Sequence, residues 1–158
     1  SRRGFIGVNF HPAFISRRVY DQIETNFGRY KREIKARTRG REGDPAFLSD
    51  IEWEYFQRAV VDNDKVFLDQ LIDHIVHIAA LGSIDCVGLG SDFDGIASTP
   101  VDLRNAAAYP ALVAGLGRRG FRSGEIAKIC GLNLRAFLRR VERAAKKELP
   151  QNILLIKL

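Results

Sequence analysis

The chain has 158 residues, of which 46% are hydrophobic and 28% charged, and these proportions are typical of one globular domain. Its two cysteines, Cys86 and Cys130, stand in apolar stretches, so we predict buried thiols rather than a disulfide framework. No apolar run approaches the roughly 20 residues of a bilayer-spanning helix, and the sequence therefore predicts no transmembrane segment.

The formal net charge of +6 is unevenly distributed along the chain. Lys and Arg outnumber Asp and Glu from Ser16 to Gly43 and from Arg118 to Lys147, whereas acidic residues dominate from Asp44 to Gly117. Basic segments either bind nucleic acid or acidic membranes, or they form solvated helix faces. We predict solvated faces and expect no nucleic-acid partner. The acidic middle of the chain would suit a cation site.

An apolar run, Gly4–Phe10, opens the chain and predicts a short buried strand. The run stops at His11 and Pro12, because proline has no N–H with which to continue a β-ladder. His11 and Phe14 are therefore expected on a loop just beyond a strand end. Taken alone, His11 fits an exposed loop histidine better than a ligand.

Two helical runs are expected next, separated by the charged loop Arg37–Gly43. Ser16 is the expected N-cap of the first run, and Ser49 is expected to open the second. Apolar residues recur at helical spacing, at Val19, Ile23, Phe27, Tyr30 and Ile34 and then at Trp53, Phe56 and Val60. We interpret Trp53 and Tyr55 as packing residues.

A third helix is expected from a cap at Asn63 or Asp64 to Gly82. Its apolar positions are Phe67, Leu68, Leu71, Ile72, Ile75, Ile78 and Ala79. His74 and His77 lie three residues apart in this helix, a spacing that can bind zinc. Because they stand in mid-helix among isoleucines, we predict structural roles for both.

A second strand is expected from Cys86 onward, because an apolar, glycine-containing run there stops abruptly at Asp92 and Asp94. The carboxyl ends of parallel strands are where α/β proteins bind ligands. We therefore expect Asp92 to end a strand parallel to the first, at the same end as His11. Aspartates also cap loops, and the residues alone leave both interpretations open.

The remainder predicts a helix opening at Tyr109-Pro110, another with Ser123 as its N-cap, and a third from Leu134 through Val141. The apolar tail Asn152–Ile156 fits no predicted element. The chain has no Rossmann fingerprint, P-loop or EF-hand spacing.

Several of these segments together resemble the membrane dipeptidases, zinc peptidases of the amidohydrolase type built on a (β/α)8 TIM barrel. The resemblance is carried by VGLGSDFDG and the preceding LIDHIVHI, by GVNFHPAFI and by ICGLNLRAFLRRVE. It implies an α/β fold, namely the C-terminal part of a (β/α)8 barrel with its last two strand–helix units. Residues 1–148 would form this portion, with a helical insertion at 16–63 and a tail at 149–158. A complete barrel typically needs about 250 residues.

The resemblance also implies an activity, the hydrolysis of dipeptides at a two-zinc centre. Asp92 is the family ligand position that carries over; it would touch a zinc and handle the proton of the attacking water. His11 and Phe14 become candidate substrate-binding residues. Phe14 falls where some members carry a substrate-contacting tyrosine, and it keeps the ring without the hydroxyl.

The other ligands of the family, an H-x-D pair, a bridging glutamate and two histidines, lie on earlier strands that are not in these 158 residues. We therefore expect an incomplete zinc site, no activity from this chain alone, and a need for the N-terminal part of the barrel as a partner. A homo-oligomer and a cytoplasmic location are further expectations. The alternative is a non-catalytic remnant or binding module that uses its basic helices.

Overall fold

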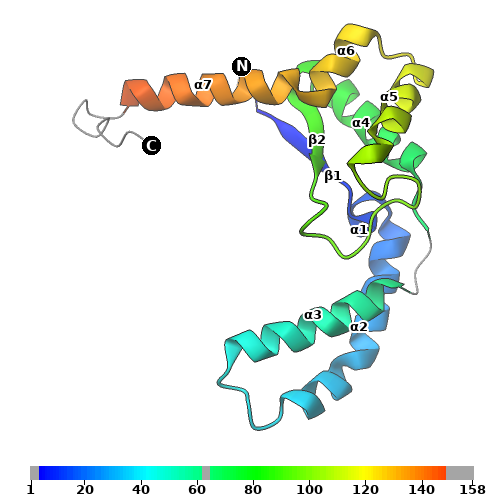
Figure 1. Cartoon of the computed structure of the whole chain (residues 1–158), viewed down its shortest axis with the longest axis vertical. Helices are drawn as coiled ribbons and strands as arrows, with labels where there is room; N and C mark the ends of the chain where they lie inside the picture. Colours follow the sequence, from blue (N-terminus) through cyan, green and yellow to red (C-terminus); the bar gives the residue numbers. More distant parts are fainter. Residues whose placement is uncertain (1–3, 62–64, 149–158) are drawn as a thin grey trace.

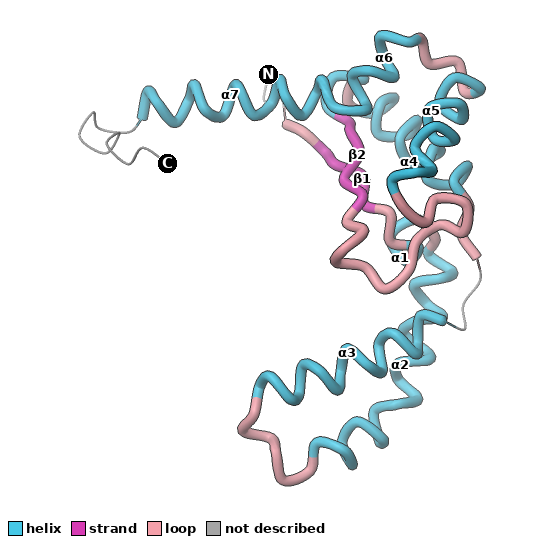
Figure 2. The backbone as a smooth tube through the Cα atoms, in the orientation of Figure 1, coloured by secondary structure: helices cyan, strands magenta, loops and turns pink. Residues whose placement is uncertain are grey.

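A computed structural model of the chain describes residues 4–61 and 65–148 (Figure 1). Two short strands lie at the centre, and helices make up most of the remainder (Figure 2). The elements in chain order are β1 (Ile6–Asn9), α1 (Pro12–Ile15), α2 (Arg17–Thr38), α3 (Pro45–Val61), α4 (Leu68–Leu81), η1 (Ile84–Cys86), β2 (Val87–Ser91), η2 (Ala106–Ala108), α5 (Tyr109–Arg118), α6 (Ser123–Ala127), η3 (Lys128–Leu132) and α7 (Asn133–Glu148).

The strands β1 and β2 pair in parallel, which confirms the predicted strand arrangement. The register pairs Val8 with Leu89 and then Asn9 with Ser91, so Gly90 is an extra residue in a β-bulge. A Cβ at Gly90 would lie 2.8 Å from the carbonyl of Gly7, so the strands approach this closely only because that position is glycine.

The core lies between the two strands and the helices α4 and α5, which Figure 1 shows on one side of the sheet. The side chains that fill it are fully buried and mostly aliphatic: Leu71, Ile72, Ile75, Leu112, Leu116, Val87 and Phe10. At Gly115 of α5 an added Cβ would collide with the side chain of Ile72. The missing side chain therefore lets α4 and α5 pack closely.

Helices α2 and α3 form a hairpin that projects away from the strands (Figure 1). The predicted cap at Ser16 is confirmed, because its hydroxyl accepts a hydrogen bond from the N–H of Val19. The predicted start of α3 at Ser49 is wrong. The helix begins at Pro45, because the Asp44 carboxylate accepts from the N–H of Phe47 at 3.1 Å.

Helix α4 begins at Leu68, and its predicted cap, Asn63 or Asp64, lies outside the described residues. The Gln70 side chain accepts from the N–H of Phe67 at 2.9 Å, and Asp102 accepts from that of Leu68 at 2.7 Å. The predicted end at Gly82 is confirmed.

The C-terminal helices largely follow the prediction. Helix α5 starts at Tyr109 with Pro110 in its first turn, as expected. The prediction of Ser123 as the N-cap of α6 is wrong by one residue; the helix starts there, and Glu125 accepts from the N–H of Arg122 at 2.8 Å. A π-helical turn, η3, leads into α7, which extends away from the body of the chain (Figure 1).

The thiols only partly match the prediction. Cys86 is half-buried and donates to the carbonyl of Ser83 at 3.0 Å, whereas Cys130 is exposed and its predicted burial is wrong. Both are free thiols. Within residues 4–61 and 65–148, no helix is long and apolar enough to cross a membrane.

Candidate functional site

Asp92 lies immediately after β2, where the chain leaves the strand through two left-handed residues. Ser91 has a φ of 44° and Asp92 a φ of 75°. L-residues seldom adopt this region, although aspartate tolerates it better than most, and such strain is concentrated at functional sites. The turn is closed by the N–H of Gly95, which donates to the Asp92 carbonyl at 3.0 Å.

Asn9, the last residue of β1, fixes the Asp92 carboxylate. Its Nδ2 donates to Asp92 Oδ2 at 2.9 Å, and its Oδ1 accepts from the N–H of His11 at 2.7 Å. One amide thus links the ends of both strands. Sequence reasoning did not single out Asn9, although the VNF segment that contains it carried part of the resemblance.

Gly95 leaves room for this arrangement. A Cβ at position 95 would collide with Oδ1 of Asp92, so the carboxylate lies directly against the glycine. The hydrogen bond from Asn9 goes to Oδ2. Oδ1 has no hydrogen-bond partner among the residues that the structure describes. This oxygen is therefore able to accept a proton or a donor group.

His11 is buried, with 6% of its surface exposed, so the expectation of an exposed loop histidine is wrong. Its Nδ1 accepts from the N–H of Ala13 at 3.2 Å, which places the proton of the neutral ring on Nε2. Within the described part of the chain, Nε2 is buried without a hydrogen-bond partner. Such an unsatisfied buried donor is rare, and it is able to donate to a polar group that enters the cavity.

Burial lowers the pKa of His11 from its ordinary value of about 6.5, and the negative charge of Asp92 partly opposes that shift. The imidazole is therefore neutral at pH 7. Two aromatic rings flank it: Phe14, with ring centroids 5.3 Å apart, and Phe56, stacked at 6.2 Å with an interplanar angle of 20°.

A cavity of about 250 Å³ brings the predicted site residues together. Its lining comes from the strand ends, from α1, from the α2–α3 hairpin and from the loop after β2: His11, Ala13, Phe14, Tyr20, Ile23, Glu24, Phe56, Asp92, Gly95, Ile96 and Ala97. Phe14 is 65% exposed, so its ring is accessible to a ligand that enters the cavity. The part played by the hairpin was not predicted, because it depends on contacts between residues far apart in sequence.

The described residues do not fit a zinc centre by themselves. Among them no group of three or more His, Cys, Asp and Glu converges, whereas protein zinc sites use three or four ligands. His74 and His77 do not form a pair, because Nε2 of His74 donates to the carbonyl of Ile15 at 2.9 Å and His77 is exposed. The predicted structural role is thus supported for His74.

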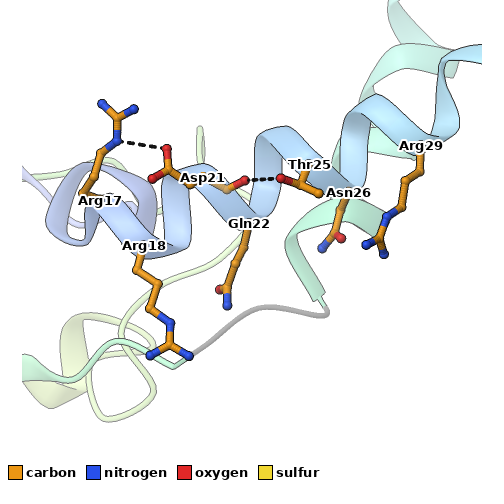
Figure 3. A pocket seen from close by; sticks show the side chains of 7 residues that line it. All are labelled: Arg17, Arg18, Asp21, Gln22, Thr25, Asn26 and Arg29. Carbon is orange, nitrogen blue, oxygen red and sulfur yellow. Dashed lines mark hydrogen bonds and ion pairs between the residues drawn. The ribbon is translucent and has the colours of Figure 1, made fainter.

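A second hollow, of about 650 Å³, is wide open and lies along one face of α2 (Figure 3). Arg17, Arg18 and Arg29 line it together with Asp21, and Arg17 is paired with Asp21 at 2.9 Å. It contains neither Asp92 nor His11. Its chemistry is that of a charged, solvated helix face.

Comparison of the sequence with known proteins identifies its family. The family described as membrane dipeptidase (peptidase family M19) matches residues 1–152. Dipeptidase ataJ of Aspergillus terreus is 43% identical over 79 residues, which are 50% of this chain and 19% of that protein. Dipeptidase tcpJ of Claviceps purpurea is 36% identical over 87 residues, 55% of this chain and 20% of that protein.

Dipeptidase verJ of Clonostachys rogersoniana is 33% identical over 92 residues, which are 58% of this chain and 24% of that protein. The matched part of the chain thus spans about a fifth to a quarter of the length of these relatives. Since the family match extends over nearly all of its residues, the chain belongs to the membrane dipeptidase family, peptidase family M19.

Proposed function

We propose that this chain forms part of a dipeptidase active site, in which Asp92 moves the proton and His11 binds the substrate. The observation that carries the proposal is the Asn9 amide, which holds the Asp92 carboxylate and the backbone of His11 at one end of the parallel strands. Both side chains face the same cavity.

Asp92 is suited to general acid–base work in amide hydrolysis. Asn9 fixes one carboxylate oxygen, and Oδ1 remains open to accept a proton from the attacking water. The same carboxyl group then returns that proton to the departing amine, so the group ends the cycle as it began. Because the Asn9 amide is itself anchored to the His11 N–H, the carboxylate is held before substrate arrives.

His11 is suited to bind a substrate oxygen. Its neutral ring carries the proton on Nε2, and that donor has no partner within the described chain. A carbonyl or carboxylate oxygen of a dipeptide would satisfy it and recover the free energy lost by burying an unpaired donor. Phe14 supplies an apolar contact beside the ring, at 5.3 Å between centroids.

The zinc that the resemblance implies does not fit the described residues alone, so no step of this proposal is assigned to it. We propose that the chain is the C-terminal part of a family barrel, with β1 and β2 as its last two strands and residues 16–63 as an inserted helical hairpin. The remaining strands would supply the metal ligands, and this chain alone would be inactive.

The experiment measures the release of free amino acids from a dipeptide panel with zinc present, in two arms. One arm holds the 158-residue chain, and the other adds the complementary N-terminal part of a family barrel. We expect turnover only in the second arm, its loss in Asp92→Asn, and its retention in Asp94→Asn, a matched control because Asp94 does not line the cavity.

Turnover by the chain alone that disappears in Asp92→Asn would contradict the proposal that this chain holds only part of the active site. Absence of Asp92-dependent turnover in both arms would overturn the assignment of function. The alternative, a binding module that uses its basic helices, would then be tested by salt-dependent nucleic-acid binding. Against that alternative, Arg37 and Arg41 of the hairpin are already paired with Glu54 and Asp44.

A further inference from the structure

The helical hairpin forms one wall of the cavity beside Asp92. Tyr20 and Ile23 reach the cavity from α2 and Phe56 reaches it from α3, facing the same space as His11 and Asp92. The segment interpreted from sequence as a helical insertion, residues 16–63, therefore contributes to the candidate active site. A wall supplied by a separate element can vary without disturbing the catalytic carboxylate.

The size of the cavity selects what can occupy it. Its volume of about 250 Å³ lies below the roughly 300–1,000 Å³ of pockets that enclose whole small-molecule ligands. One amino-acid side chain fits such a space better than a complete dipeptide. The backbone of a dipeptide would then lie at the edge of the cavity, within reach of Asp92 and His11.

The wall is apolar and held in place by packing. Ile23 is 4% exposed, and the Phe56 ring is fixed between His11, on which it stacks, and the edge of Phe27 at 6.4 Å between centroids. Ile96 and Ala97 complete the apolar lining from the loop after β2. Such a surface gains free energy by covering an apolar guest.

The charges around the cavity are of one sign. Its ionised side chains are the carboxylates of Glu24 and Asp92, and no Lys or Arg is among the described residues that line it. An acidic side chain there would lose its water next to two negative charges, with the neutral Nε2–H of His11 as a donor but no cation to pair it. Rejection of one ligand class by unpaired charge is a common basis of specificity.

We propose that the α2–α3 hairpin forms a specificity pocket that accepts an apolar side chain of a dipeptide and rejects an acidic one. This inference rests on the proposed function, because that function is what makes a dipeptide the ligand. Tyr20, Ile23 and Phe56 are its specificity-determining residues.

The test is calorimetric titration of the 158-residue chain with Gly-Phe, Phe-Gly, Gly-Glu and Glu-Gly. We expect one of the phenylalanine dipeptides to bind about tenfold more tightly than its glutamate counterpart, since burying an aromatic ring is favourable. Phe56→Ala should bring this ratio close to one. Phe47→Ala, on the same hairpin but away from the cavity, is the matched control and should keep it.

A second variant guards against a folding defect in Phe56→Ala. Tyr20 is 40% exposed, so Tyr20→Arg adds a cation to the wall at little cost in packing. It should raise the affinity for the glutamate dipeptide relative to the phenylalanine one. Equal binding of both classes by the wild type, no dipeptide binding at all, or a preference unchanged by both variants would overturn the pocket.

The two proposals fail in different ways. In one outcome, selective binding persists in Asp92→Asn, but neither arm of the activity experiment shows Asp92-dependent hydrolysis. That result would contradict the proposed function and support the pocket. Hydrolysis that depends on Asp92 but does not distinguish phenylalanine from glutamate dipeptides would support the proposed function and contradict the pocket.

Discussion

At the scale of single residues, the main feature is the strain and burial concentrated at the ends of the two strands. Asp92 adopts a left-handed backbone, and the buried Nε2 of His11 has no hydrogen-bond partner among residues 4–61 and 65–148. Each of these costs stability, and both lie at one cavity. Residues retained at such a cost are the ones most directly connected with function.

His11 should make stability depend on pH. Because its pKa is lowered in the folded chain, the unfolded chain binds more protons below about pH 6.5, and the free energy of unfolding falls on acidification from there. Above that pH, His11 is neutral in both the folded and the unfolded chain, and it causes no loss of stability. Thermal unfolding from pH 7.5 to 5 should therefore show a falling midpoint.

The variant His11→Gln should flatten part of this pH dependence, because it removes the group that titrates. His77→Gln changes an exposed histidine on α4 and should retain the wild-type profile. If the profiles of His11→Gln and the wild type coincide, then the stability loss in acid has another origin.

At the scale of elements, the position of β2 depends on a side chain of helix α7 that hydrogen-bonds to the beginning of the strand. Asn133, at the start of α7 and 5% exposed, donates through Nδ2 to the carbonyls of Ile84 at 2.6 Å and Val87 at 2.9 Å. This one side chain links α7 to the beginning of β2. It thereby fixes the strand whose other end carries Asp92.

Asn133→Ala should lower the free energy of unfolding by about 1–3 kcal/mol, because two buried carbonyls lose their donor. Denaturant unfolding followed by circular dichroism measures this change. Arg135→Ala, at an exposed position of the same helix, is the control and should stay near the wild type. Equal stability of Asn133→Ala and the control would show that water replaces the lost donor.

Local determinants made some element boundaries predictable from sequence, although the caps of α3 and α6, also local, were assigned to the wrong residues. The caps at Ser16 and Gly82 depend on residues within one turn, and both predictions are confirmed. The start of α4 depends instead on Asp102, which is 34 residues from Leu68 in sequence and close only after folding. Periodicity carries no information of that kind.

The candidate site divides in the same way. The apolar runs and their polar ends predicted that Asp92 and His11 share one end of a parallel pair. The burial of His11 and the walls from Tyr20 and Phe56 were not predictable, because they depend on tertiary contacts that bring these residues to one cavity. Asn9 was missed because its two partners become apparent only in three dimensions.

At the scale of the whole molecule, several large apolar side chains are exposed to solvent. Along α7, Leu134, Leu138 and Val141 are between 39% and 49% exposed, and Ile6 of β1 is 50% exposed. A two-stranded sheet also leaves strand edges open. These are surfaces that a further part of a barrel, or a second copy, would cover.

The isolated chain should therefore associate in solution. Sedimentation velocity over a range of concentrations should show oligomers, and the double variant Leu138→Lys with Val141→Lys should shift the distribution toward monomer. Leu81→Lys changes a single exposed leucine at the end of α4 and should not. A monomer at every concentration tested would contradict this expectation.

The stacked rings beside the cavity have a practical consequence. Trp53 is the single tryptophan of the chain, its ring stacks on Phe56 at 5.6 Å, and Phe56 stacks in turn on His11. The chain thus carries one natural fluorophore two ring contacts from the histidine. Anything that displaces Phe56 or charges the imidazole alters the surroundings of that fluorophore, so emission from the unlabelled protein reports the state of its interior without any added dye.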